Sequence, residues 1–247
     1  MDTRINDFAK LISESRKTVF FGGAGVSTES GVKDYRSKDG LYSTVKEYGV
    51  SPEEILSHTF FIQNPDVFYD FYYKYFLSVS PKPNRAHRAL AELEKKGKLS
   101  AVITQNIDGL HQKAGSENVI ELHGSVFYHY CPQCMKQYPN DKIVEKKGKV
   151  PRCDNCGTVI RPRVTLYEEQ LDEAAVSSAV REISSAELLI IGGTSLAVYP
   201  AAMYIRYFRG RNIVLINRDE TQYDGMASLI FRESIGEVLE ETVKRSK

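Results

Sequence analysis

Every cysteine of the chain lies in one polar, turn-rich stretch, as two pairs of the form C-x2-C separated by 18 residues. The pairs are Cys131 with Cys134 and Cys153 with Cys156. This spacing is typical of four thiolates that bind one tetrahedral zinc ion, and four protein ligands leave no open position for a substrate. Two disulfides are the alternative, which an intracellular chain disfavours. We therefore predict a structural zinc site.

Outside this stretch the chain alternates between apolar strands and amphipathic helices. The patterns predict strands at residues 18–23, 100–106, 187–193 and 212–217, and helices at residues 4–15, 84–97 and 171–185. Apolar strands separated by helices indicate a parallel sheet that is covered on both faces. Ligands of such sheets bind at the carboxyl ends of the strands. We expect the polar residues after each strand to meet there, namely residues 23–27, 105–108, 193–195 and Asn217.

A glycine-rich turn, residues 23–31 (GAGVSTESG), follows the first predicted strand. Glycines in such a turn let backbone N–H groups approach a phosphate without Cβ atoms in the way. The spacing differs from the G-x-G-x-x-G pattern of dehydrogenases, because Thr28 stands where the third glycine would be. The turn therefore indicates a nucleotide, and a plain strand-to-helix turn is the alternative.

Charge and hydropathy exclude several classes of protein. The net charge is +1 and the pI is about 7.6, which gives no basic footprint for nucleic acid. The longest apolar runs are far shorter than a membrane span, and the first residues carry no signal-peptide apolar region. We expect a cytoplasmic protein that contacts neither membranes nor nucleic acid directly. A non-enzymatic zinc-ribbon binding module is the alternative, and a salt-dependent gel shift would reveal it.

Two further features are ambiguous from the residues alone. Residues 36–80 form an insertion rich in aromatic side chains, and we expect a helix that packs most of these rings into a small core. His123 follows a short apolar segment and precedes a glycine, which makes it a candidate general base. His87 is interpreted as a packing or capping residue, whereas His58 and His129 have no supporting context.

In order along the chain, these motifs resemble those of the sirtuins, the NAD-dependent protein lysine deacylases. The resemblance runs from about residue 4 to about residue 240 and is carried by residues 23–37, 104–111, 121–124, 192–202 and 215–217 and by the four cysteines. It implies an α/β fold with two parts: a large domain with a Rossmann-like parallel sheet, and a small domain made of a zinc module and a helical module. The large domain would comprise residues 1–35, 81–124 and 161–247, the helical module residues 36–80 and the zinc module residues 125–160.

The resemblance also implies roles for individual residues. NAD would be a co-substrate bound by Gly23, Ala24, Gly25, Ser27, Thr28, Asp34, Tyr35, Arg36, Gln105, Asn106, Asp108, His123, Gly193, Thr194, Ser195 and Asn217. The catalytic residues would be His123, Asn106 and Asp108. An acylated peptide would add as a β-strand along Val164, Thr165, Leu166 and Tyr167. The products would be free lysine, nicotinamide and O-acetyl-ADP-ribose, with His123 as general base on a ribose hydroxyl.

Departures from the family pattern bear on the substrate. Sirtuins that remove succinyl or malonyl groups carry a Tyr-x-x-Arg pair in the helical module, and we align that pair with Tyr72 and Tyr75, so the arginine is replaced. We therefore predict deacetylation over desuccinylation, with removal of longer uncharged acyl groups as an alternative.

Lys33 replaces a usual proline and Tyr35 a usual phenylalanine in the cofactor loop. A protein mono-ADP-ribosyltransferase on the same scaffold is a further alternative, which the presence of His123 disfavours.

Overall fold

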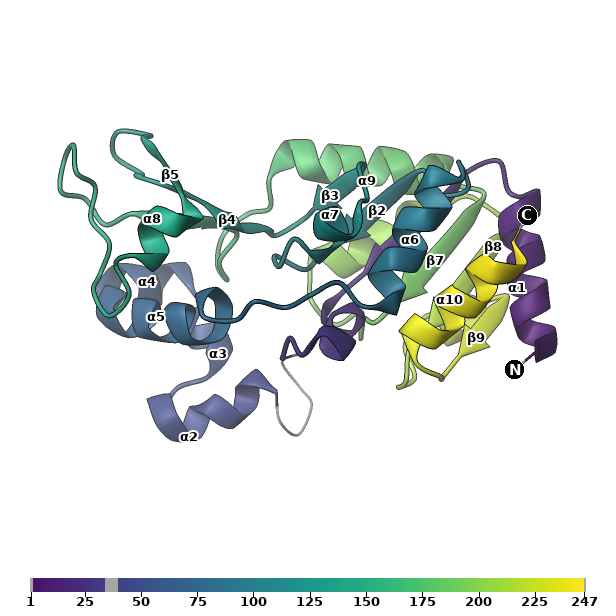
Figure 1. Cartoon of the computed structure of the whole chain (residues 1–247), viewed down its shortest axis with the longest axis horizontal. Helices are drawn as coiled ribbons and strands as arrows, with labels where there is room; N and C mark the ends of the chain where they lie inside the picture. Colours follow the sequence, from purple (N-terminus) through teal and green to yellow (C-terminus); the bar gives the residue numbers. More distant parts are fainter. Residues whose placement is uncertain (1, 34–39, 247) are drawn as a thin grey trace.

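The computed structural model describes residues 2–33 and 40–246, so the predictions for Asp34, Tyr35 and Arg36 lie outside the described residues. Two sheets organise this part of the chain. One has six parallel strands, and the other has three antiparallel strands. The two sheets lie toward opposite ends of the long axis of the molecule (Figure 1). This arrangement confirms the predicted α/β fold with a large parallel sheet and a smaller second unit.

The six-stranded sheet has the order β3-β2-β1-β7-β8-β9. Its strands are β1 (Thr18–Gly22), β2 (Ala101–Thr104), β3 (Val119–Glu121), β7 (Leu188–Gly192), β8 (Asn212–Ile216) and β9 (Leu229–Phe231). From β1 the chain adds strands first on one side and later, from β7 onward, on the other. The order therefore reverses between β1 and β7, and such a switch point leaves a crevice at the carboxyl ends of these two strands.

Helices cover both faces of this sheet (Figure 1). Phe20 of β1 points into one core, which contains α1 (Asp2–Glu14), α6 (Arg85–Lys95) and α10 (Ile235–Arg245). Its neighbours Val19 and Phe21 point into the other, which contains α9 (Glu173–Ser185) and the 3-10 helix η5 (Ala201–Tyr207). Successive strand side chains face opposite sides, so a fully apolar strand requires both layers. Shorter helical segments near the site are η1 (Ala24–Val26), η2 (Thr28–Ser30), α7 (Leu110–Ala114) and η6 (Asp224–Met226).

The second unit combines helices with the three-stranded sheet. The helices are η3 (Leu41–Thr44), α2 (Val45–Tyr48), α3 (Pro52–Ile55), α4 (His58–Gln63), α5 (Pro65–Tyr72), the π-helical turn η4 (Tyr73–Leu77) and α8 (Asn140–Val144). The strands are β4 (Gly124–Tyr130), β5 (Gln137–Pro139) and β6 (Arg161–Val164), in the order β5-β4-β6. One apolar core joins the two parts, and the rings of Phe68, Tyr69, Phe71 and Tyr72 are buried in it. This burial confirms the expected packing of the aromatic run.

Predicted element positions hold to within a few residues at each end. Asn84 caps α6 as expected, because its side-chain oxygen accepts from the backbone N–H groups of Ala86 and His87. β9 was not predicted. A domain boundary at residue 161 would separate β6 from its partner β4, since the two strands pair in the smaller sheet. Within residues 2–33 and 40–246, no helix is both long and apolar enough to cross a membrane.

Candidate active site

A cavity of about 650 Å³ opens at the carboxyl edge of the parallel sheet. The segments that follow β1, β2, β7 and β8 all line it, which confirms that the polar residues after these strands meet at one edge. The far wall comes from the second unit and includes Phe76 and the segment from Val164 to Tyr167. The cavity therefore lies between the two sheets, with a polar wall on the large sheet and a more apolar wall opposite.

Two glycine loops pack against each other at the switch point. The backbone N–H of Gly25 donates to the carbonyl oxygen of Gly193 over 2.8 Å. A Cβ atom on Gly25 would lie 2.8 Å from the Cα atom of Gly193, and one on Gly193 would lie 2.4 Å from the Val26 nitrogen. Gly193 also has a φ of +59°, which side chains rarely adopt. Only glycine fits at both positions, and the close approach leaves the backbone of residues 23–25 facing the cavity.

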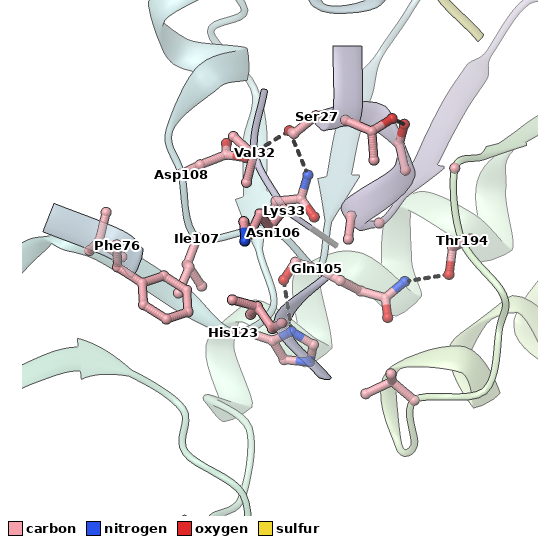
Figure 2. Close-up of a pocket in the computed structure, with 18 of the residues that line it drawn as sticks. Ser27, Val32, Lys33, Phe76, Gln105, Asn106, Ile107, Asp108, His123 and Thr194 are labelled. Atoms are coloured by element: carbon pink, nitrogen blue, oxygen red, sulfur yellow. Dashed lines mark hydrogen bonds between the residues drawn. The ribbon is translucent and has the colours of Figure 1, made fainter. Parts of the chain in front are cut away.

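Ser27 is fully buried beside the cavity, and its hydroxyl joins the side chains of Asp108 and Asn106 (Figure 2). Its hydroxyl donates to Oδ2 of Asp108 over 2.7 Å and accepts from Nδ2 of Asn106 over 3.0 Å. Nε2 of His87 lies 3.4 Å from the same hydroxyl. Oδ1 of Asp108 accepts from the backbone N–H of Leu110. The network fixes the Asn106 amide and the Asp108 carboxylate at the cavity wall, where hydroxyl groups of a ribose could bind.

Nδ1 of His123 has a hydrogen-bond partner in the protein, whereas Nε2 has none among residues 2–33 and 40–246, and the residue lines the cavity. Its Nδ1 lies 2.8 Å from the carbonyl oxygen of Gln105, so Nδ1 must carry the proton in this bond (Figure 2). Nε2 of the neutral ring is then an acceptor. Burial lowers the pKa of His123 below its ordinary value, against the opposing effect of the Gln105 bond. A neutral imidazole with a free acceptor nitrogen is the form that a general base requires.

The other predicted cofactor residues that the structure describes also line the cavity. Nε2 of Gln105 donates to Oγ1 of Thr194 over 3.2 Å, which links the segments after β2 and β7. Thr28 donates its hydroxyl to the carbonyl oxygen of Gly25 and so holds the first glycine loop. Asn217 follows β8 and donates to the backbone of Asp219 over 2.9 Å; three strands separate β8 from β3, the strand before His123. The full set brought to the cavity is Gly23, Ala24, Gly25, Ser27, Thr28, Gln105, Asn106, Asp108, His123, Gly193, Thr194, Ser195 and Asn217.

The segment from Val164 to Tyr167 forms the wall nearest to His123. Val164 and Leu166 are buried, whereas Tyr167 is exposed at the rim. The backbone N–H of Thr165 donates to the carbonyl oxygen of His123 over 2.9 Å, so the candidate base and the predicted peptide strand are joined directly. All four residues line the cavity. Arg163, on the preceding strand, is exposed and is not among the described residues of the cavity wall.

The four cysteines gather at one point of the smaller unit. Their sulfur atoms all lie within 4.8 Å of one another, and all four cysteines are free of disulfide bonds. A hydrogen bond from Tyr138 lowers the pKa of Cys153 to about 6, whereas burial raises the pKa of Cys131 to about 11. Four sulfurs at this separation are the donor set that a tetrahedral zinc ion needs, because thiolates so close together require a cation between them. The residues present therefore fit structural zinc.

The other histidines do not line the cavity. His87, His111 and His129 are buried, and His58 contacts a residue of the cavity wall. His87 caps α6 as predicted and His111 lies against it, with ring centroids 4.7 Å apart. Burial lowers the pKa of His87 to about 4, that of His111 to about 3 and that of His129 to about 4. His58 bonds to Glu169 over 2.8 Å at the end of the Val164–Tyr167 segment. Sequence reasoning missed this contact, because the two residues are far apart in the chain and neither belongs to a motif.

Comparison with known proteins agrees with this geometry. The Sir2 family model matches residues 23–200. The NAD-dependent protein deacetylases of Clostridium acetobutylicum and Clostridium perfringens are 49% and 52% identical over 240 residues, and each alignment covers 97% of this chain and 98% of the relative. A Sir2 structure with a deacetylated p53 peptide and 3′-O-acetyl ADP ribose has a TM-score of 0.89 at 39% identity, with 97% of each chain covered. A Sir2 structure with a p53 peptide and NAD⁺ has a TM-score of 0.84 at 40% identity, with 96% of each covered.

The fold and the cavity define a dinucleotide-binding α/β protein with a zinc-type cysteine module beside its site. The extent of the family match and the identity to relatives over nearly the whole chain specify it further. The chain belongs to the Sir2 family.

Proposed function

We propose that this protein is an NAD-dependent protein lysine deacetylase, which transfers the acetyl group of acetyl-lysine to ADP-ribose and releases nicotinamide. The observation that carries the proposal is the position of His123. Its Nδ1 proton is held by Gln105, and its backbone carbonyl is held by Thr165 of the predicted peptide strand. A base is thus placed where a nucleotide on one wall and a peptide on the other would meet. The names and bound ligands of the relatives support the same activity.

The residues of the large sheet would bind NAD. Residues 23–25 line the cavity without side chains at Gly23 and Gly25, so a pyrophosphate would have room to lie close to the backbone, and the Ser27 network would present Asn106 and Asp108 to a ribose. Asn217 is the proposed contact for the second ribose. His123 would accept a proton at Nε2 from a ribose hydroxyl. Enclosure between the two walls would keep water from the activated sugar.

Cys131, Cys134, Cys153 and Cys156 would hold one Zn²⁺ ion with all positions filled by protein. The ion would stabilise the module that carries β4 and β6, and it supplies no chemistry to the reaction. We also propose the predicted division into a large domain, a helical module (residues 36–80) and a zinc module, with one boundary changed. Because β6 pairs with β4, the zinc module would extend over residues 125–164, and the large domain would comprise residues 1–35, 81–124 and 165–247.

The partners of the site would be acetylated lysines of other proteins. Phe76, Ile107 and Val126 line the cavity, and such apolar side chains favour uncharged acyl groups over a succinyl carboxylate, which would lose its hydration beside them. Tyr75, the residue aligned with the acyl-binding arginine, instead donates its hydroxyl to Glu47 over 3.0 Å. We therefore infer a preference for acetyl and longer uncharged acyl groups. Equal rates on succinylated and acetylated forms of one peptide would contradict it.

Product analysis tests the proposed reaction. The enzyme is incubated with NAD and an acetyl-lysine peptide, and the products are separated by chromatography and weighed by mass spectrometry. Deacetylation predicts nicotinamide, free-lysine peptide and O-acetyl-ADP-ribose in equal amounts. ADP-ribose attached to protein, with the acetyl group still on lysine, would instead show a mono-ADP-ribosyltransferase.

A further inference from the structure

Glu169 accepts four hydrogen bonds from three residues, two of which precede it closely in the chain and one of which, His58, lies far away in sequence. Its Oε1 accepts from Nη1 of Arg161 over 2.7 Å and from Nδ1 of His58 over 2.8 Å. Its Oε2 accepts from Nη2 of Arg161 over 2.8 Å and from the backbone N–H of Leu166 over 2.9 Å. These contacts fill the roughly four acceptor positions of a carboxylate. Glu169 therefore has one defined orientation, set by partners on all sides.

Glu169 and Arg161 form hydrogen bonds to the backbone of the Val164–Tyr167 segment, which forms the cavity wall beside His123. Nη2 of Arg161 also donates to the carbonyl oxygen of Val164 over 3.2 Å, and Leu166 is held through its N–H. The residue between them, Thr165, points its N–H the other way, to the carbonyl oxygen of His123. In an extended strand, alternate residues present their backbone groups to opposite edges. The Val164 carbonyl and the Leu166 N–H are thus held by Arg161 and Glu169, and the Thr165 N–H is held by the candidate base.

His58 connects this arrangement to the helical part of the second unit. It is the first residue of α4, and its backbone N–H donates to the carbonyl oxygen of Tyr167 over 3.0 Å. The N–H of Tyr167 donates in turn to Leu56, and the next backbone N–H in α4, that of Thr59, donates to the Glu168 carboxylate over 2.9 Å. The end of the Val164–Tyr167 segment is therefore tied to the start of α4 by backbone and side-chain bonds together.

Arg161 and Glu169 are more deeply buried than His58, so loss of their contacts affects the stability of the fold more. The side chains of Arg161 and Glu169 are 12% and 18% exposed, whereas that of His58 is 49% exposed. Removal of one partner from a largely buried ion pair strands the other charge and destabilises the fold. The hydrogen bond from His58 lies nearer to solvent. Its loss should therefore lower the stability of the fold less, and it should change mainly the orientation of Glu169. His58 is consequently the place where this arrangement can be loosened without unfolding the protein.

We propose that Glu169, held by Arg161 and His58, is the positioning residue for the acylated peptide, and that His58 sets its orientation. This inference rests on the proposed deacetylase function. Glu169, Thr165 and Leu166 line the peptide wall of the cavity, whereas the nucleotide wall is built from the glycine loops and the Ser27 network. A change at His58 or Glu169 therefore weakens binding of the peptide and leaves binding of the nucleotide unchanged.

The experiment measures two binding constants on the zinc-loaded full-length protein. One is the Kd of a fluorescent acetyl-lysine peptide, and the other is the Kd of ADP-ribose, which occupies the nucleotide wall alone. The variants are His58→Ala, His58→Asn and Glu169→Gln. Asparagine places its Nδ2 as many bonds from Cα as the Nδ1 of histidine and can restore the bond. Glu54→Gln, an exposed position on α3, is the control for changes in the helical module.

We expect His58→Ala to raise the peptide Kd about three- to tenfold, the range for loss of one ordinary hydrogen bond, because the His58 side chain is half exposed; the Kd of ADP-ribose should stay within about twofold. His58→Asn should return the peptide Kd to near the wild-type value, and Glu54→Gln should change neither. Equal loss of both ligands, or an unchanged peptide Kd in both His58→Ala and Glu169→Gln, would overturn the inference. A wild-type protein that binds ADP-ribose but deacetylates no acyl peptide would instead contradict the proposed function.

Discussion

Nδ1 of His123 lies 2.8 Å from the carbonyl oxygen of Gln105, and this single contact determines which nitrogen can act. A carbonyl oxygen accepts and never donates, so the proton stays on Nδ1 and Nε2 keeps its lone pair. Gln105 also bonds Thr194 through its side chain, on the far side of the switch point. The tautomer of the base is therefore set by the same residue that joins the two nucleotide-binding segments.

The pH dependence of catalysis follows from the burial of His123. Burial lowers its pKa below the ordinary value near 6.5, and only the neutral ring can accept a proton. Activity should therefore be retained as the pH falls to 6.5 and decline only below it, as the ring becomes protonated. The measurement is kcat/KM for an acetyl-lysine peptide between pH 5 and 8. A midpoint above pH 7 on the acid limb would contradict this assignment.

Acid should destabilise the fold through three buried histidines that do not bind substrate directly. The pKa values of His87, His111 and His129 are lowered to about 4, 3 and 4, whereas the unfolded chain titrates near 6.5. Between these values the unfolded state binds more protons, so the free energy of unfolding rises with pH and is lost as the pH falls below 6.5. Each histidine contributes up to about 2 kcal/mol between pH 7.5 and 5. Urea unfolding at the two pH values measures the difference, and equal stability would exclude the effect.

Gly193→Ala should abolish tight binding of NAD. The new Cβ would meet the Val26 nitrogen at 2.4 Å, and the φ of +59° adds strain, so the loop must move away from Gly25. We expect the Kd of ADP-ribose to rise at least tenfold. Gly97→Ala is the matched control, because Gly97 has a φ of +69° but no atom within 4 Å of an added Cβ. Gly97→Ala should lower the stability of the fold by about 1 kcal/mol and leave nucleotide binding intact. Equal Kd changes in both variants would show that backbone strain, and not the contact with Val26, explains the effect.

Zinc should be present at one ion per chain and should be needed for the peptide wall. Cys134→Ser removes one of four ligands, and we expect loss of bound zinc, a lower melting temperature and weak peptide binding, because β6 pairs with β4 next to the cysteines. Metal content is measured by mass spectrometry. Gln133→Ala, exposed within the same C-x2-C pair, is the control and should keep its zinc. Full peptide binding by a metal-free sample would refute a structural role.

The parallel sheet and much of the polar cavity wall that it carries could be predicted from sequence, because both rest on local patterns, whereas most of the wall from the second unit could not. Apolar runs such as β1 require cover on both faces, and polar residues after parallel strands must share an edge. The contact between His58 and Glu169 could not be predicted in this way. It depends on how α4 meets the end of β6, and no periodicity or spacing encodes that meeting. The unpredicted β9 is a strand of three residues, which is too short to show alternation.

Comparison of wild type with His123→Ala tests the central claim most directly. Nicotinamide release and peptide deacetylation are measured together, with NAD, an acetyl-lysine peptide and zinc-loaded protein of confirmed fold. We expect wild type to release nicotinamide only when the acetylated peptide is present, and we expect deacetylation to be lost or nearly lost in the variant. Undiminished deacetylation by His123→Ala would contradict the assignment of His123 as the general base.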